Sequence, residues 1–164
     1  VIPVQWPHLS GFDLLGPSVD LPEGLVVGEE SEWERYRIRA GIPAMGAELD
    51  ETTIPGATGV LEQSVSFTKG CYTGQELVAR IDSRSAGTPT RLVRARGGAE
   101  MGVEFPPPGS RLEVNGNAVG KLTSVTDDGS GFIALAYVKR GVDVPEKALS
   151  HWDGKTAEIV LLAD

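Results

Sequence analysis

The residues best suited to chemistry lie in one short segment, Lys69-Gly70-Cys71-Tyr72-Thr73-Gly74-Gln75-Glu76. Cys71 is the only cysteine among 164 residues. The positive charge of Lys69 and the N-terminus of a helix that begins after Cys71 would both favour the thiolate over the thiol. Gly70 and Gly74 would let the backbone approach a ligand closely. A reactive thiol is one interpretation, but a lone cysteine is usually a small buried hydrophobe, and spacing alone favours that alternative.

Arg37 is the second candidate, because it follows Trp33 and Tyr36 at helical spacing, near the face that these aromatic residues would bury. An arginine in such a place either pairs with a carboxylate or binds a ligand anion. Glu48 and Asp50 are the protein partners that we expect, so a structural role is favoured.

Composition restricts the function classes. The net charge of -8 argues against direct nucleic-acid binding, since phosphate neutralisation needs clustered cations. Residues 80–96 carry mainly arginine among their charges, and a solvated basic surface is favoured there over an anion site. One cysteine and two separated histidines, His8 and His151, predict no disulfide and no metal centre. We expect neither a signal peptide nor a membrane span, which predicts a cytoplasmic protein or one in another reducing compartment.

The first half of the chain is expected to mix helices and strands. A capping box formed by Ser31 and Glu34 predicts a helix that stops at Gly41. Short strands are expected at residues 12–15 and 65–67. A second capping box, Thr73 with Glu76, predicts a helix that runs to about residue 84 and is broken at residues 85–89.

The second half is expected to be all-β. Asn115-Gly116 is a strong hairpin signal between strands at 112–114 and 119–125, and a further turn at 127–129 leads into a strand at 132–138. Residues 91–93 and 157–162 complete five or six short strands, while His151 is placed in a late loop. A small antiparallel barrel is predicted, since closure removes exposed sheet edges. The predicted domains are residues 1–87 and 88–164.

Four segments resemble one family. Residues 69–76 resemble the signature of the YgfZ family, the folate-binding relatives of the glycine-cleavage T-protein (GcvT). Residues 36–43 resemble that superfamily's "RIEAGIP" segment, residues 50–55 resemble the acidic-Thr-Pro segment after it, and residues 119–124 resemble a strand of its C-terminal barrel. The likeness implies an α+β protein: the C-terminal part of a folate-binding α/β domain, followed by a small β-barrel. The opening residue, Val1, also suggests a fragment, and residues 1–87 would then be a partial domain.

The resemblance also implies a function. YgfZ-type proteins bind tetrahydrofolate and support the assembly or repair of iron–sulfur clusters, including those of tRNA-thiolating enzymes. Cys71 would then be the functional thiol, with Lys69 beside it, and iron–sulfur proteins would be partners. By the same resemblance, the folate contacts would be Arg37, Tyr72, Gly74, Gln75, Glu76 and Arg91. Because most of the folate channel would lie upstream, this chain alone is expected to bind folate weakly or not at all.

The resemblance leaves an alternative function, a folate-dependent aminomethyltransferase. T-proteins usually have an aromatic residue where Cys71 stands, and their pterin-contacting acid is matched here by Leu9 or Ser10. Both departures argue against aminomethyl transfer. Whether the protein turns over a substrate stays open at this point, as does a third possibility, a purely structural barrel module with an unreactive, buried Cys71.

Overall fold

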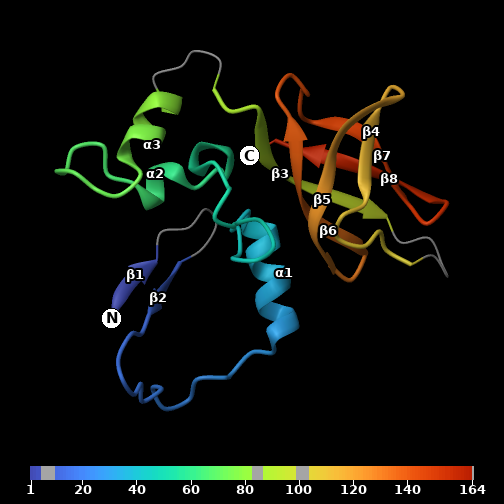
Figure 1. Cartoon of the computed structure of the whole chain (residues 1–164). Helices are drawn as coiled ribbons and strands as arrows, with labels where there is room; N and C mark the ends of the chain where they lie inside the picture. Colours follow the sequence, from blue (N-terminus) through green and yellow to red (C-terminus); the bar gives the residue numbers. More distant parts are fainter. Residues whose placement is uncertain (5–9, 83–86, 99–103, 164) are drawn as a thin grey trace.

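The computed structural model describes residues 1–4, 10–82, 87–98 and 104–163, without the side chains of residues 77 and 80–82. A β-barrel forms one side of the molecule, and the N-terminal ribbon and short helices form the other (Figure 1). Helix α1 lies between the two parts. The elements, in chain order, are β1 (Ile2–Val4), β2 (Gly11–Asp13), α1 (Glu30–Ala40), the 3-10 turn η1 (Pro55–Ala57), α2 (Leu61–Ser64), α3 (Gln75–Asp82), β3 (Thr90–Gly98), β4 (Arg111–Val114), β5 (Asn117–Asp127), β6 (Gly131–Lys139), β7 (Glu146–Trp152) and β8 (Lys155–Leu162).

Six antiparallel strands close into a barrel in the order β3-β6-β5-β4-β7-β8, with β8 pairing back to β3. Alternate residues along each strand point into the barrel and form its core. On β6, Phe132, Ala134 and Ala136 point into the main core cluster, together with Leu112 and Leu122 from the neighbouring strands. Their burial supplies the apolar area that stabilises a small barrel. The predicted α+β fold with a C-terminal antiparallel barrel is confirmed.

Helix α1 packs on the outer face of the barrel, mainly over β5 and β6. Ile38 packs there against Leu92 and Leu135, with Ile133 and Tyr137 alongside. Strand β6 is therefore buried on both faces, which accounts for its nearly continuous apolar sequence. This contact sets the position of the helical segments relative to the barrel.

The hairpin turns follow their sequence signals. Asn115 and Gly116 both adopt positive φ, as a two-residue I′ hairpin between β4 and β5 requires. Asp153 and Gly154 form a second turn of this kind between β7 and β8. His151 therefore lies in a strand, opposite Thr156, and its assignment to a loop was wrong. The Asp-Gly pair was the signal that could have revealed strand β7.

Three local predictions in the first half need correction. Helix α1 begins at Glu30, and the carboxylate that accepts from the N-cap backbone N–H is Glu32, at 2.8 Å from Glu29 N. The Ser31–Glu34 capping box is therefore wrong, because the helix starts upstream of it, whereas the stop at Gly41 is confirmed by its left-handed φ of 75°. The strand at 12–15 lies at Gly11–Asp13 instead.

The strand predicted at residues 65–67 was also wrong. Residues 61–64 form α2, and the alternating residues after it belong to no regular element. In the described residues, no strand runs beside them to complete a ladder, and a strand needs such a partner for its backbone hydrogen bonds.

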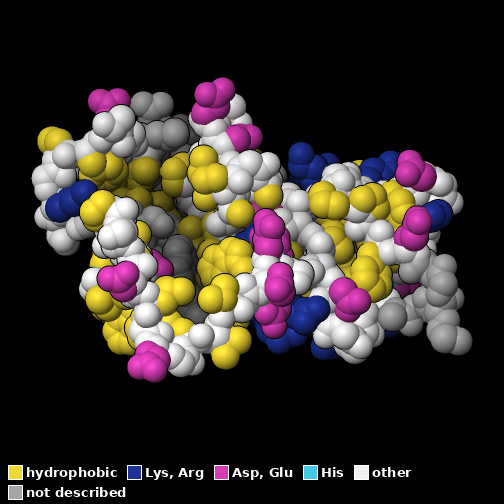
Figure 2. Space-filling view, turned by 90° about the horizontal axis from the view of Figure 1, so that it is seen from below, with side chains coloured by type: hydrophobic (Ala, Val, Ile, Leu, Met, Phe, Trp, Pro, Cys, Tyr) yellow, Lys and Arg dark blue, Asp and Glu magenta, His cyan; other side chains and the backbone are white. Residues whose placement is uncertain are grey.

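The described N-terminal residues leave much apolar surface exposed. Phe12 is 70% exposed, Leu15 is 74% and Val26 is 92%. Figure 2 shows apolar side chains gathered over the half of the molecule that carries β1 and β2. Exposed apolar side chains gathered on one face are typical of surfaces that contact another protein segment.

Candidate functional site

Cys71 lies in an exposed loop between α2 and α3 and is a free thiol. The expectation of a buried cysteine, which spacing alone favoured, is therefore wrong. Lys69 places its Nζ 5.4 Å from the centre of the Tyr72 ring, in a cation–π contact. The loop thus presents a thiol, a cation and an aromatic ring to solvent.

Helix α3 begins at Gln75, so its first turn lies beyond the predicted N-cap, Thr73. Gly74, with φ of 86°, directly precedes the helix, and the backbone N–H of Gln75 donates to Tyr72 O at 3.2 Å. The Thr73–Glu76 capping box therefore places the helix start too early.

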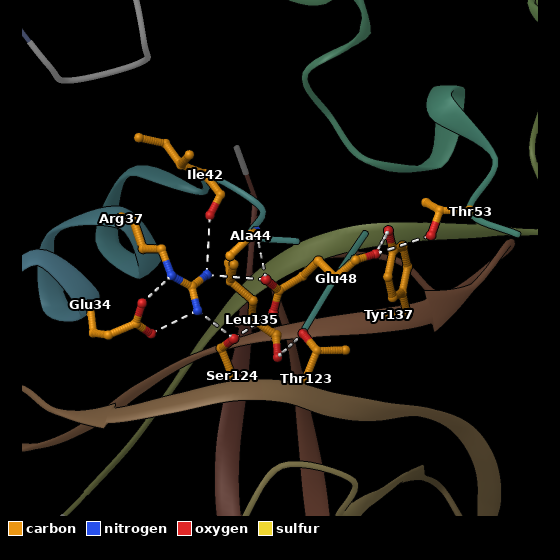
Figure 3. A network of polar contacts seen from close by, with 10 residues as sticks. All are labelled: Glu34, Arg37, Ile42, Ala44, Glu48, Thr53, Thr123, Ser124, Leu135 and Tyr137. Carbon is orange, nitrogen blue, oxygen red and sulfur yellow. Dashed lines mark hydrogen bonds and ion pairs between the residues drawn. The ribbon is translucent and has the colours of Figure 1, made fainter. Parts of the chain in front are cut away.

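Arg37 is 4% exposed and lies at the junction of α1 with the barrel (Figure 3). Its Nε and one terminal nitrogen donate to the two carboxylate oxygens of Glu34 at 2.6 and 2.7 Å. The remaining hydrogens go to Ile42 O at 3.2 Å, Glu48 Oε2 at 3.1 Å and Ser124 Oγ at 2.8 Å. A guanidinium has five N–H donors, and five protein contacts use them.

Glu48 connects three parts of the chain, and its side chain is 0% exposed. Its carboxylate accepts from Arg37 on α1, from Ala44 N at 3.0 Å and from Ser124 Oγ of β5 at 2.6 Å. Its backbone carbonyl accepts from Tyr137 Oη of β6 at 3.1 Å. We call Glu34, Arg37, Glu48 and Ser124 the Glu48 cluster. Glu48 was one of the two partners expected for Arg37, whereas Asp50 instead accepts from Thr52 in a local turn.

The electrostatics of the junction follow from burial and from these carboxylates. Burial lowers the pKa of Arg37, but hydrogen bonds and attraction from Glu34 and Glu48 outweigh it, and the pKa is raised overall. Burial, together with the negative charges of Glu48 and Asp50, raises the pKa of Tyr137 to about 12. Arg37 stays cationic and Tyr137 stays neutral at neutral pH.

Because of Tyr137, the stability of the fold should decrease at alkaline pH. The folded-state pKa lies above the ordinary 10.0, so the stabilisation is complete below pH 10 and is lost as pH rises through about 12. The urea midpoint of the wild type should fall more steeply above about pH 10 than that of Tyr137→Phe. Parallel pH profiles of the two proteins would contradict this assignment.

The structure separates the other predicted site residues. Arg91 is exposed at the start of β3, and its guanidinium donates to Val142 O at 2.6 Å. No described contact joins Arg91 or Arg37 to the loop of Cys71. As a folate contact, each stays a prediction, and Arg37 has its donors already occupied by protein acceptors. The segment around Leu9 lies outside the described residues.

Two cavities lie near the barrel. One of about 560 Å³ borders the Glu48 cluster and is lined by Glu34, Arg37 and residues of β5. The other, of about 730 Å³, is lined by residues of β3, β4, β7 and β8 and by two turns, and it holds charges of both signs but none of the predicted site residues. Neither cavity contains the Cys71 loop.

None of the helices in the described part of the chain is both long and apolar enough to cross a membrane. No group of three His, Cys, Asp or Glu side chains there is arranged to hold a metal ion.

The sequence and the fold of the chain were compared with those of known proteins. No protein-family model matches the chain. A chloroplastic protein of Arabidopsis thaliana, provisionally named a transferase, is 38% identical over 123 residues, covering 73% of this chain. The tRNA-modifying protein YgfZ of Yersinia pestis is 44% identical over 59 residues, covering 35% of this chain. The aminomethyltransferase T of the Bartonella henselae glycine cleavage system shares the fold, with a TM-score of 0.63 over 79% of this chain at 20% identity.

These likenesses make the chain YgfZ-like in sequence and GcvT-like in fold. It corresponds to the C-terminal portion of that fold, as the resemblance predicted. It spans 27% of the Arabidopsis relative, 18% of the Yersinia YgfZ and 36% of the Bartonella protein. The activity, ligand and partners of a whole YgfZ/GcvT-like protein are therefore proposals for this chain. The Arabidopsis relative is chloroplastic, so a cytoplasmic location stays a prediction.

Proposed function

We propose that this chain belongs to a tetrahydrofolate-binding accessory protein that supports the assembly or repair of iron–sulfur clusters, with Cys71 as its functional thiol. The observation that carries the proposal is the exposed Cys71 within a YgfZ-type segment of a YgfZ/GcvT-like chain. A thiolate is both a nucleophile and a ligand for iron, and an exposed position makes it accessible to a client protein.

The surroundings of Cys71 support an accessible binding surface. Lys69 and Tyr72 are held together by their cation–π contact, and Gly74 adopts a positive φ that other residues rarely adopt. Lys69, Tyr72 and Gly74 are therefore proposed to present Cys71, and Gln75 and Glu76 to line the folate side of the same segment. Arg91 is proposed only as a peripheral contact, because it lies at the barrel.

Replacing the thiol tests the proposal. In a strain that depends on this protein, Cys71→Ser should reduce the activity of iron–sulfur enzymes to roughly the level of the deletion strain. Thr68→Ala, an exposed change in the same loop, should leave that activity within about twofold. Full support of iron–sulfur enzymes by Cys71→Ser would refute the role of the thiol.

Folate binding is tested separately by calorimetric titration of tetrahydrofolate. We propose that the 164-residue chain binds it weakly or not at all, because the relatives that it matches are much longer. A dissociation constant in the low-micromolar range, about 8 kcal/mol of binding free energy, would show that this chain holds a complete site and would contradict the proposal.

Aminomethyl transfer is the alternative function. Its support is the T-protein fold, which at 20% identity extends to the fold alone. An aminomethyltransferase would release ammonia from a glycine-derived aminomethyl donor, and Cys71→Ser would leave it nearly intact. Ammonia release that survives this substitution would therefore favour the alternative over the accessory role.

A further inference from the structure

We propose that Glu48 is a positioning residue that fixes the orientation of the Cys71 segment relative to the barrel. The carboxylate acts through the connecting segment (residues 41–60), which joins α1 to α2 and includes η1. The importance of this positioning rests on the proposed role of Cys71, but its test does not.

The first step is the attachment of the connecting segment to the barrel. Glu48 belongs to this segment, yet its carboxylate accepts from Ser124 of β5 and its carbonyl accepts from Tyr137 of β6. Figure 3 shows both contacts converging on Glu48 from the barrel side. One residue therefore holds the middle of the segment against two adjacent strands.

The second step is the contact between the connecting segment and the Cys71 region. The turn η1, at the end of the segment, contacts both helix α3 and strand β3. Ala57, Thr58 and Val60 are buried there, as is Val78 of α3. Since α3 follows the Cys71 loop directly, a displacement of η1 would move the loop.

The third step is the difference between Glu34 and Glu48, the two carboxylates that pair with Arg37. Glu34 is a second carboxylate for Arg37, and its side chain is 38% exposed, so Arg37 keeps a counter-ion if Glu48 is neutralised. Glu34 and Arg37 both lie on α1, and their ion pair joins no separate elements. Loss of the Glu48 charge should therefore loosen the connecting segment, whereas loss of the Glu34 charge should not.

The lone cysteine makes the test direct. Nitroxide labels on Cys71 and on Lys155→Cys, which is exposed at the start of β8, report the distance between the loop and the barrel by pulsed electron spin resonance. Glu48→Gln should widen the distance distribution roughly twofold and raise amide exchange in residues 44–60 roughly tenfold. Barrel amides in β3 and β6 should keep their protection.

Two matched variants complete the experiment. Ser124→Ala removes one contact from the barrel side and should widen the distribution less than Glu48→Gln does. Glu34→Gln should leave it unchanged. Equal widening in Glu34→Gln, or an unchanged distribution in both Glu48→Gln and Ser124→Ala, would overturn the proposal. Neither outcome depends on folate binding or on iron–sulfur enzymes, so failure here is distinguishable from failure of the proposed function.

Discussion

Arg37→Ala is expected to lower the free energy of unfolding by roughly 3–5 kcal/mol, the usual cost of breaking a buried ion pair by removing one partner. The substitution leaves the carboxylate of Glu48, which is fully buried, without its cation. It also removes a donor from Ile42 O and from Ser124 Oγ. Because small domains are stable by only about 5–15 kcal/mol, this loss is a large share of the total.

Urea denaturation followed by tryptophan fluorescence measures the effect of Arg37→Ala. Arg39→Ala, two residues away and exposed on the same helix, serves as the matched control and should stay within about 0.5 kcal/mol of the wild type. If Arg37→Ala were as mild as Arg39→Ala, the Glu48 cluster would contribute little to the fold. Arg37 would then be available for the ligand role that the sequence also suggested.

Gly120→Ala is the second large effect, with an expected loss of at least about 2–3 kcal/mol of unfolding free energy. Gly120 lies in β5 opposite Val138 of β6. An added Cβ would collide with the backbone carbonyl of Tyr137, which no side-chain rotation can relieve. Strands β5 and β6 would have to separate at this point. Tyr137 would then move, and the hydrogen bond from its hydroxyl to Glu48 O would be disturbed.

Gly98→Ala is the matched control for Gly120→Ala. It changes the same residue type in barrel strand β3, where an added Cβ has no atom within 4 Å and φ is not positive. Thermal unfolding followed by circular dichroism should show a clear fall in the melting temperature for Gly120→Ala and a shift of only a few degrees for Gly98→Ala. Similar melting temperatures for the two variants would mean that β5 and β6 can adjust at this point.

The proposed function and the positioning role of Glu48 concern two different parts of the molecule. Cys71 is exposed and therefore accessible to a reaction partner. The carboxylate of Glu48 is buried, and other protein groups already satisfy its charge. A thiol acting on a client needs access, and it also needs a fixed direction of approach. The structure supplies access through the loop, and the Glu48 cluster is proposed to supply the direction.

The barrel was predictable because its signals are local. Alternating apolar residues, Asn115-Gly116 and the turn at 127–129 determine strands and hairpins over a few residues each. Strand β7 was missed although Asp153-Gly154 carried the same kind of signal as Asn115-Gly116. The strand expected at 65–67 had the right alternation but lacked a partner strand, which sequence alone does not supply.

The site was only partly predictable from the sequence. The pairing of Arg37 with Glu48 follows from charge and from the short separation of the two residues along the chain. Ser124 and Tyr137 are far from Glu48 in sequence, and nothing in their neighbourhood marks them as partners. The packing of α1 on β5 and β6 brings them together, because a long-range polar contact depends on the path of the whole chain.

The sequence by itself determined the family, the barrel and the position of the lone Cys71 ahead of a helix, since these depend on residue types at short spacings. The tertiary structure decided that Cys71 is exposed and that all donors of Arg37 are used within the protein. Burial and hydrogen-bond partners are properties of residues brought together from distant segments. For that reason the chemical role of a side chain could be proposed from the sequence, while its availability could not.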